Sequence, residues 1–156
     1  MTSFHSLAIE KNSATNEHKA AVSKNYYQSP MQFITDFMQT YNDVYQPEMT
    51  IDDVDRLFSF TSDDMEDHHI SYNVSFSGKE GRAKSTAGLL AKGENSITYQ
   101  LTTESIILGR DSAVISFVED AKYYKNGKEK HYVGRWILVL EINDAGKVSM
   151  MRRYFN

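Results

Sequence analysis

The hydrophobic pattern becomes periodic near residue 30. In "SPMQFITDFMQTYNDVY", residues 29–45, apolar side chains recur at intervals of three and four, the spacing of one helical face. Ser29 can cap the free N–H groups, Pro30 suits the first helical position, and Pro47 ends the pattern. The stripe consists of Phe33, Ile34, Phe37, Met38, Tyr41 and Val44 or Tyr45. These positions predict an amphipathic helix that covers a core.

A second helix, a strand and a third helix are predicted next. The stretch "TIDDVDRLFSF" begins with Thr50 as a helix cap, places Asp53 close to a capping-box position, and gathers its apolar residues on one face. Apolar and polar residues alternate over residues 70–76, which predicts a half-buried strand. The stretch "GKEGRAKSTAGLLAKG", residues 78–93, predicts a helix that ends at its last glycine.

After this helix the pattern changes to the period of two that is typical of strands. The turn signals "GRD", "NG" and "NDAG" separate the apolar runs. Four long strands are predicted, at residues 96–108, 112–124, 131–142 and 147–155. The order is helix, helix, strand, helix and four antiparallel strands. We therefore predict an α+β fold in which three N-terminal helices pack on one face of a curved antiparallel sheet.

Composition narrows the class of protein. Residues 1–28 lack a sustained apolar period and predict a flexible N-terminal arm, which leaves one domain at residues 29–156. A net charge of −4 without a Lys/Arg run argues against nucleic-acid binding. The chain has no cysteine, which excludes disulfides and thiol catalysis. It has no membrane-length apolar run, secretion signal or cofactor fingerprint, so we expect a cytoplasmic protein without membrane contact or cofactor.

The "NG" turn at residues 126–127 allows the faces of its two strands to be assigned. Counting back from a two-residue turn places Phe117 opposite Trp136 and Glu119 opposite Gly134. Phe117 and Trp136 belong to an apolar face, which is predicted to look inward, and Glu119 lies on that face. Desolvation there would raise the pKa of Glu119 and make it a candidate general acid or base. Alternatively, Glu119 lies past the edge of the core, where it is solvated or paired with a lysine.

The opposite face of the same two strands is also partly apolar. Val133, Ile137 and Val139 lie on it and would be exposed in a monomer. This pattern favours a homodimer that covers the outer face of the sheet.

The element order, the strand pair "GRWILVLEI…GKV" and the ending "RRYF" resemble the SnoaL-like branch of the nuclear transport factor 2-like superfamily. The resemblance covers residues 29–156. It implies a cone-shaped fold that encloses an apolar cavity, and homodimers formed through the outer face of the sheet. The group contains polyketide cyclases, ketosteroid isomerase, limonene epoxide hydrolase and scytalone dehydratase, together with members without known activity. Since one fold carries many activities, the site must decide the function.

The chain departs from the residues that this resemblance implies. In the polyketide cyclases an acid acts from the strand before "GK", and the matching inward position here is Trp136. The ending "RRYFN" is similar to "R-D/E-Y-F-D" in the family, but Arg153 and Asn156 stand where acids are usual. Arg152 is retained and is a candidate for the pocket, although "SMMRR" shows no clear alternation.

The stretch "DDMEDHHISY", residues 63–72, is rich in acids and histidines. Neighbouring residues of a strand point to opposite faces, so His68 and His69 cannot both serve one metal ion, and no metal site is expected. The family resemblance implies that this loop enters the first strand at the cavity mouth. If Ile70 and Tyr72 face the cavity, His68 does too, whereas an irregular entry would bring in His69.

The sequence is compatible with three functions. The favoured one is a pocket that binds a small hydrophobic or aromatic molecule. The second is an isomerase, cyclase or dehydratase that uses Glu119 and one of the two histidines for proton transfer. The third is a dimeric protein-interaction module. The residues predicted to contact a ligand are Tyr72, Tyr99, Phe117, Trp136 and Arg152.

Overall fold

The structure, a computed structural model, describes residues 25–156. Its helices are α1 (Pro30–Asp43), α2 (Ile51–Phe58) and α3 (Gly78–Asn95). Its strands are β1 (Thr61–His69), β2 (Val74–Ser77), β3 (Ser96–Leu108), β4 (Ser112–Lys125), β5 (Lys128–Ile142) and β6 (Val148–Phe155). A 3-10 turn, Ile70–Tyr72, joins β1 to β2.

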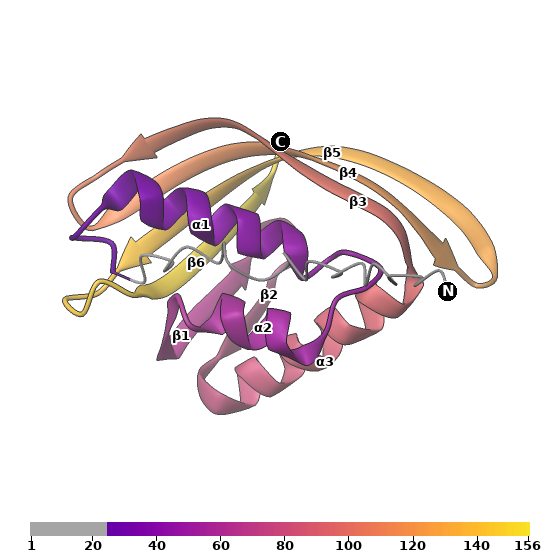
Figure 1. Cartoon of the computed structure of the whole chain (residues 1–156), viewed down its shortest axis with the longest axis horizontal. Coiled ribbons are helices and arrows are strands. Elements are labelled where there is room, and N and C mark those ends of the chain that lie inside the picture. The colour runs from indigo at the N-terminus through magenta and orange to yellow at the C-terminus, as the bar shows by residue number, and fades with distance from the viewer. Residues whose placement is uncertain (1–24) are drawn as a thin grey trace, which may run out of the picture.

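All six strands form one sheet in the order β2-β1-β6-β5-β4-β3. Neighbouring strands are antiparallel except β1 and β6, which run parallel. Antiparallel pairing is therefore confirmed for β3 to β6, but the prediction of a wholly antiparallel sheet is wrong because the sheet is mixed. Figure 1 shows β3, β4 and β5 arching over the three helices. This curvature leaves the inner face of the sheet to hold the core and the site.

Two helices precede the first strand, as in the predicted element order. The third, α3, follows β2 in the chain and packs against β1 and β2. The α+β class and the packing of helices against a curved sheet are confirmed, whereas the description of all three helices as N-terminal is not, because β1 and β2 come before α3.

Of the three helix-end signals predicted from the sequence, the capping box of α2 is confirmed. The backbone N–H of Thr50 donates to the Asp53 carboxylate at 2.9 Å, as a capping box requires. The side chain of Ser29, the predicted cap of α1, makes no capping hydrogen bond. Gly93 does not end α3, which continues to Asn95. A Cβ at this glycine would lie 2.5 Å from Cγ of Met49. Gly93 therefore permits close packing of α3 on the segment between α1 and α2.

Strand β1 is the main departure from the predicted elements. The sequence predicts a loop followed by a strand over residues 70–76, but the strand begins at Thr61 and Ile70–Tyr72 form the 3-10 turn. Met65 and Asp67 are buried, while the acidic residues next to them in the strand are exposed. An alternation in which one inward residue is an aspartate does not stand out as hydrophobic periodicity. The parallel partner β6 lies far away in the sequence.

The last residues of the predicted N-terminal arm contact the folded domain. Tyr26, which the sequence assigns to the N-terminal arm, is only 1% exposed. Its hydroxyl lies 2.6 Å from the carbonyl oxygen of Gly109 and 3.0 Å from that of Ser112. The last residues of the predicted arm therefore pack on the turn between β3 and β4. The rest of that arm, residues 1–24, lies outside the described residues.

The hairpin between β4 and β5 has the predicted register. Asn126 and Gly127 both have positive φ angles, 54° and 70°, as a two-residue type I′ turn requires. Phe117 pairs with Trp136, and Glu119 pairs with Gly134. The assignment of these residues to the inner face is confirmed by the burial of Phe117 and Trp136.

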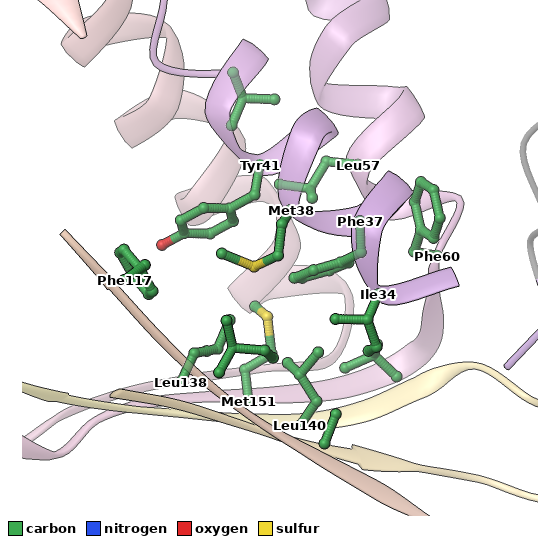
Figure 2. Packing of buried hydrophobic residues seen from close by; sticks show 14 of the residues in the cluster. Ile34, Phe37, Met38, Tyr41, Leu57, Phe60, Phe117, Leu138, Leu140 and Met151 are labelled. Atoms are coloured by element: carbon green, nitrogen blue, oxygen red, sulfur yellow. The ribbon is translucent and has the colours of Figure 1, made fainter. Parts of the chain in front are cut away.

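Helix α1 supplies much of the core. Phe37 is fully buried, and its ring centroid lies 5.9 Å from that of Phe60 and 6.1 Å from that of Tyr41. Figure 2 shows this face of α1 directed toward Leu138 and Leu140 of the sheet. This packing holds Tyr41 between the core and the site.

The outer face of the sheet carries the predicted apolar positions. Val133 is 58% exposed, and Ile137 and Val139 are half-buried. Arg135 on the same face donates two hydrogen bonds to Glu104, at 2.9 and 2.7 Å. A homodimer through this face stays a prediction. Within residues 25–156, no helix is both long and apolar enough to cross a membrane.

Candidate functional site

A cavity of about 690 Å³ lies between the inner face of the sheet, α1 and the C-terminal end of α3. Its walls are rich in aromatic rings. Tyr41 comes from α1 and Tyr45 from the segment that follows it, while Tyr99 comes from β3, Phe117 from β4 and Trp136 from β5. The rings of Tyr45 and Tyr99 are stacked, with centroids 4.7 Å apart. The volume lies within the range of about 300–1,000 Å³ that is typical of small-molecule sites.

Four of the predicted ligand-binding residues line this cavity together with the predicted acid, Glu119. The four are Tyr72, Tyr99, Phe117 and Trp136. Tyr99, Phe117 and Trp136 are buried, whereas Tyr72 is 62% exposed and belongs to the 3-10 turn. The ring centroid of Tyr72 lies 6.2 Å from that of Trp136. Tyr72 therefore marks the mouth of the cavity.

The two predicted histidines lie on different faces of β1. His69 lines the cavity. The ring nitrogens of His68 lie 2.9 Å from Ser75 Oγ and 2.9 Å from a Glu66 carboxylate oxygen, both away from the cavity. The simple alternation from Ile70 placed His68 inward and is wrong, because the chain leaves the extended conformation after His69.

Arg152, the predicted ligand-binding arginine, does not line the cavity. It pairs across the sheet with Val139 of the outer face and forms an ion pair with Glu141. Its neighbour Arg153 lies on the inner face and lines the cavity. The prediction for Arg152 is therefore wrong, and the arginine of the site is the next residue.

Arg153 is held by a buried polar cluster. Its guanidinium donates to an Asp67 carboxylate oxygen at 2.5 Å and to the Tyr41 hydroxyl at 2.6 Å. A longer contact of 3.5 Å reaches the hydroxyl of Tyr45, which itself lies 3.4 Å from that of Tyr41. The side chains of Arg153 and Asp67 are only 12% and 4% exposed. Both charges are therefore compensated almost entirely within the protein.

The pKa values within this cluster follow from its geometry. Burial alone would raise the pKa of Asp67, but the charge of Arg153 and the contacts with His69 outweigh burial and lower it. Burial raises the pKa of the Tyr41 hydroxyl well above its usual value. At neutral pH the cluster therefore combines a carboxylate, a guanidinium and a neutral phenol.

Glu119 is the titratable acid of the cavity wall. Burial raises its pKa, while the charge of Lys92 and the nearby polar groups of Trp136 and Tyr99 act in the opposite direction. The indole Nε1 of Trp136 faces this region without a hydrogen bond of standard geometry. Near neutral pH, Glu119 is therefore protonated to a larger extent than an exposed glutamate is.

The glycine opposite Glu119 makes room for a tyrosine. A Cβ on Gly134 would lie 1.9 Å from the hydroxyl oxygen of Tyr132, so the Tyr132 ring folds over this glycine. Tyr132 also lines the cavity. The space that Gly134 leaves opposite Glu119 is therefore partly occupied by an aromatic side chain.

Several polar atoms of this region are buried without a hydrogen-bond partner in the described part of the protein. They are Asp67 Oδ1, the Tyr132 hydroxyl, Trp136 Nε1 and Arg153 Nε. Buried polar groups in proteins are nearly always paired. Three of the four residues line the cavity, so polar atoms of a ligand could supply partners there. Among residues 25–156, no cluster of three or more His, Asp or Glu side chains is arranged to hold a metal ion.

Sequence reasoning misses Tyr41, Tyr45, Lys92 and Arg153 as site residues. The two tyrosines fit the apolar stripe that the sequence predicts up to residue 45, and they are interpreted there as plain core. Arg153 could have been found from the pairing of β5 with β6, which places it two residues after the buried Met151 on the same face. For Lys92 the sequence carries no comparable signal.

Comparisons with known proteins identify solved structures that share the fold of this chain. No family model matches the chain, and no curated protein matches it. A protein described as a SnoaL-like polyketide cyclase, from Shewanella putrefaciens CN-32, is 15% identical with a TM-score of 0.59, over 76% of this chain and 88% of that one. The epoxide hydrolase/cyclase-like enzyme SalBIII is 10% identical with a TM-score of 0.61, over 83% of this chain and 94% of that one.

A third similar structure contains a small molecule. It is a hypothetical protein with a ketosteroid isomerase-like fold from Catenulispora acidiphila DSM 44928, in complex with trimethylamine. It is 9% identical with a TM-score of 0.59, over 77% of this chain and 85% of that one. The chain therefore has the SnoaL-like, nuclear transport factor 2-like fold that its sequence resembles. At these identities the likeness extends to the fold and not to the chemistry.

Proposed function

We propose that the chain binds a small hydrophobic or aromatic molecule in this cavity. The observation that carries the proposal is a cavity of about 690 Å³ whose walls are aromatic and whose mouth is open beside Tyr72. Concave sites with apolar walls and a few convergent polar groups are the usual form of small-molecule sites. The unpaired polar atoms of Trp136 and Tyr132 would fix the orientation of a ligand that carries a hydrogen-bond acceptor or donor.

A protein of the same fold binds a small molecule, since the Catenulispora protein was solved with trimethylamine. This supports use of the fold for small ligands, while the identity of the ligand has to come from the residues of this chain.

Filling the cavity should weaken binding. Ala121 lines the cavity and is 9% exposed, so an indole in Ala121→Trp would occupy the space of a ligand. We expect the neutral dye N-phenyl-1-naphthylamine to show a saturable fluorescence increase with the wild-type chain. The affinity of Ala121→Trp should be lower by at least about tenfold, which corresponds to about 1.4 kcal/mol.

The matched control for this variant is Thr102→Trp. Thr102 is exposed and pairs with Val118 on the outer face, so the same side chain is added away from the cavity. This control should bind the dye like the wild-type chain. Equal dye binding by all three chains, or no saturation with any of them, would contradict the proposed function.

Acid–base catalysis is the second candidate function, and the environment of Glu119 favours it. A carboxyl group whose pKa is raised by burial, beside an aromatic cavity, can exchange a proton with a bound molecule near neutral pH. An isomerase, cyclase or lyase reaction without a cofactor would need this group and a second proton carrier. His69, which lines the same cavity, is that candidate.

Glu119→Gln separates the two functions. For a catalyst the substitution should abolish turnover of a substrate and leave its binding nearly unchanged, whereas for a binding protein neither property should change much. The raised pKa also has a consequence for folding. Glu119 disfavours the folded state once the pH exceeds its pKa in the unfolded chain, so Glu119→Gln should stabilise the protein at pH 8 relative to pH 4.

Urea unfolding at both pH values measures this difference, with Glu129→Gln on the exposed hairpin as the control. A pH-independent effect of Glu119→Gln, equal to that of the control, would show that Glu119 is solvated and would remove the catalytic candidate.

A further inference from the structure

The cavity is rich in positive charge although the chain is acidic. Of the 17 Lys and Arg residues, four line the cavity, whereas one of the 21 Asp and Glu residues does so, in a chain of net charge −4. The four are Lys92, Lys122, Lys125 and Arg153, and the acid is Glu119. A cleft lined by one sign of charge concentrates molecules of the opposite sign.

The charges of these residues are not compensated to the same degree. Arg153 is neutralised by its buried ion pair with Asp67. Among the described residues, none of the three lysines has a carboxylate within 4.0 Å. Burial keeps part of Glu119 protonated. The surplus positive charge therefore comes from the lysines.

Lys92 is the lysine with the most defined position. It projects from the last turn of α3, and its Nζ lies 5.0 Å from the centroid of the Tyr45 ring. Its charge also acts on Glu119 across the cavity wall. Because the ammonium group of Lys92 lies over the ring of Tyr45 in the cavity wall, a ligand that packs on this wall would come close to the ammonium group.

We propose that the occupant of the cavity is an apolar or aromatic acid, whose ring packs among the tyrosines and whose anionic group pairs with Lys92. This inference rests on the proposed function and adds the chemical class of the ligand. A cationic ligand would be repelled by the charge of Lys92 at the cavity wall, and a neutral ligand would leave Lys92 without a carboxylate partner. A carboxylate or a sulfonate offers the acceptor that the ammonium group lacks.

Three naphthalenes of one shape and different charge test the inference. They are 2-naphthoate, 2-naphthalenemethanol and 2-naphthylmethylammonium, each titrated into the wild-type chain by isothermal calorimetry at pH 7.5. We expect 2-naphthoate to bind at least about tenfold more tightly than the alcohol, and the ammonium compound to bind most weakly. The preference for 2-naphthoate should shrink as salt is added, because the lysine is partly exposed.

Lys92→Met tests the residue, since methionine keeps an apolar stem without the charge. It should weaken 2-naphthoate binding about five- to tenfold and leave binding of the alcohol unchanged. The control is Lys84→Met, which removes the same charge from α3 at a lysine that is paired with Glu80 at 2.8 Å and does not line the cavity.

The outcomes separate this inference from the proposed function. Binding of the alcohol that equals or exceeds that of 2-naphthoate would overturn the inference and leave the pocket intact. The same holds for preferred binding of the ammonium compound, and for equal effects of Lys92→Met and Lys84→Met. If none of the three compounds binds, the proposed function fails and the inference fails with it.

Discussion

Asp67→Asn is expected to lower the free energy of unfolding by about 3–5 kcal/mol. The substitution keeps the shape of the side chain but leaves the buried guanidinium of Arg153 without its counter-charge. Removal of one partner of a buried ion pair costs far more than the pair itself contributes. Urea unfolding followed by circular dichroism measures the change.

Two controls isolate this ion pair. Asp63→Asn changes the same residue type on the same strand, where the side chain is 94% exposed, and should cost less than about 0.5 kcal/mol. The double variant Asp67→Asn/Arg153→Met should recover part of the loss, because an apolar replacement of a buried pair is often tolerated. Losses that simply add in the double variant would contradict the coupling.

The same pair predicts the response to acid. The folded-state pKa of Asp67 is lower than that of an unfolded aspartate, so its contribution to stability is present above the unfolded pKa of about 3.9. The contribution is lost as the pH falls through the lower, folded pKa. The wild-type chain should therefore lose more stability than Asp67→Asn between pH 5 and pH 2.

Phe37→Ala is expected to destabilise the fold by a similar amount, about 3–5 kcal/mol, through a cavity in the core. Phe37 is fully buried, and its ring contacts those of Phe60 and Tyr41 (Figure 2). Met31→Ala on the exposed side of α1, at 49% exposure, is the control and should change stability by less than about 0.5 kcal/mol. A loss below about 1 kcal/mol for Phe37→Ala would mean that α1 does not pack on the sheet as described.

The elements that the sequence predicts well are those whose signals are local. Asn126 and Gly127 define a two-residue turn, and from that turn alone the positions of Phe117, Glu119 and Trp136 on one face follow. Helix α1 carries a clear apolar stripe that is confirmed by its buried residues. Local signals of this kind fix the wall of the cavity formed by β4 and β5.

The parts that the sequence does not predict depend on contacts between distant segments. The hydrophobic pattern of β1 does not reveal which residues point inward, because one of them is Asp67. The burial of Asp67 depends on its hydrogen bond to Arg153, which lies 86 residues away. The choice between His68 and His69 depends on where the strand gives way to a 3-10 turn, and the choice between Arg152 and Arg153 depends on the register of β6. Each of these requires the tertiary structure, because a shift of one residue exchanges the two faces.

The central claim, that a small molecule occupies the aromatic cavity, can be tested at Trp136, the one tryptophan of the chain. Its indole Nε1 is buried beside the cavity and makes no hydrogen bond within the described part of the protein, so its resonance should respond to an occupant. In a ¹⁵N-edited NMR titration with 2-naphthalenemethanol, we expect a saturable shift of this indole resonance together with the amide resonances of Tyr99 and Glu119. An unchanged indole resonance, with shifts confined to outer-face residues such as Thr102 and Val133, would contradict the claim.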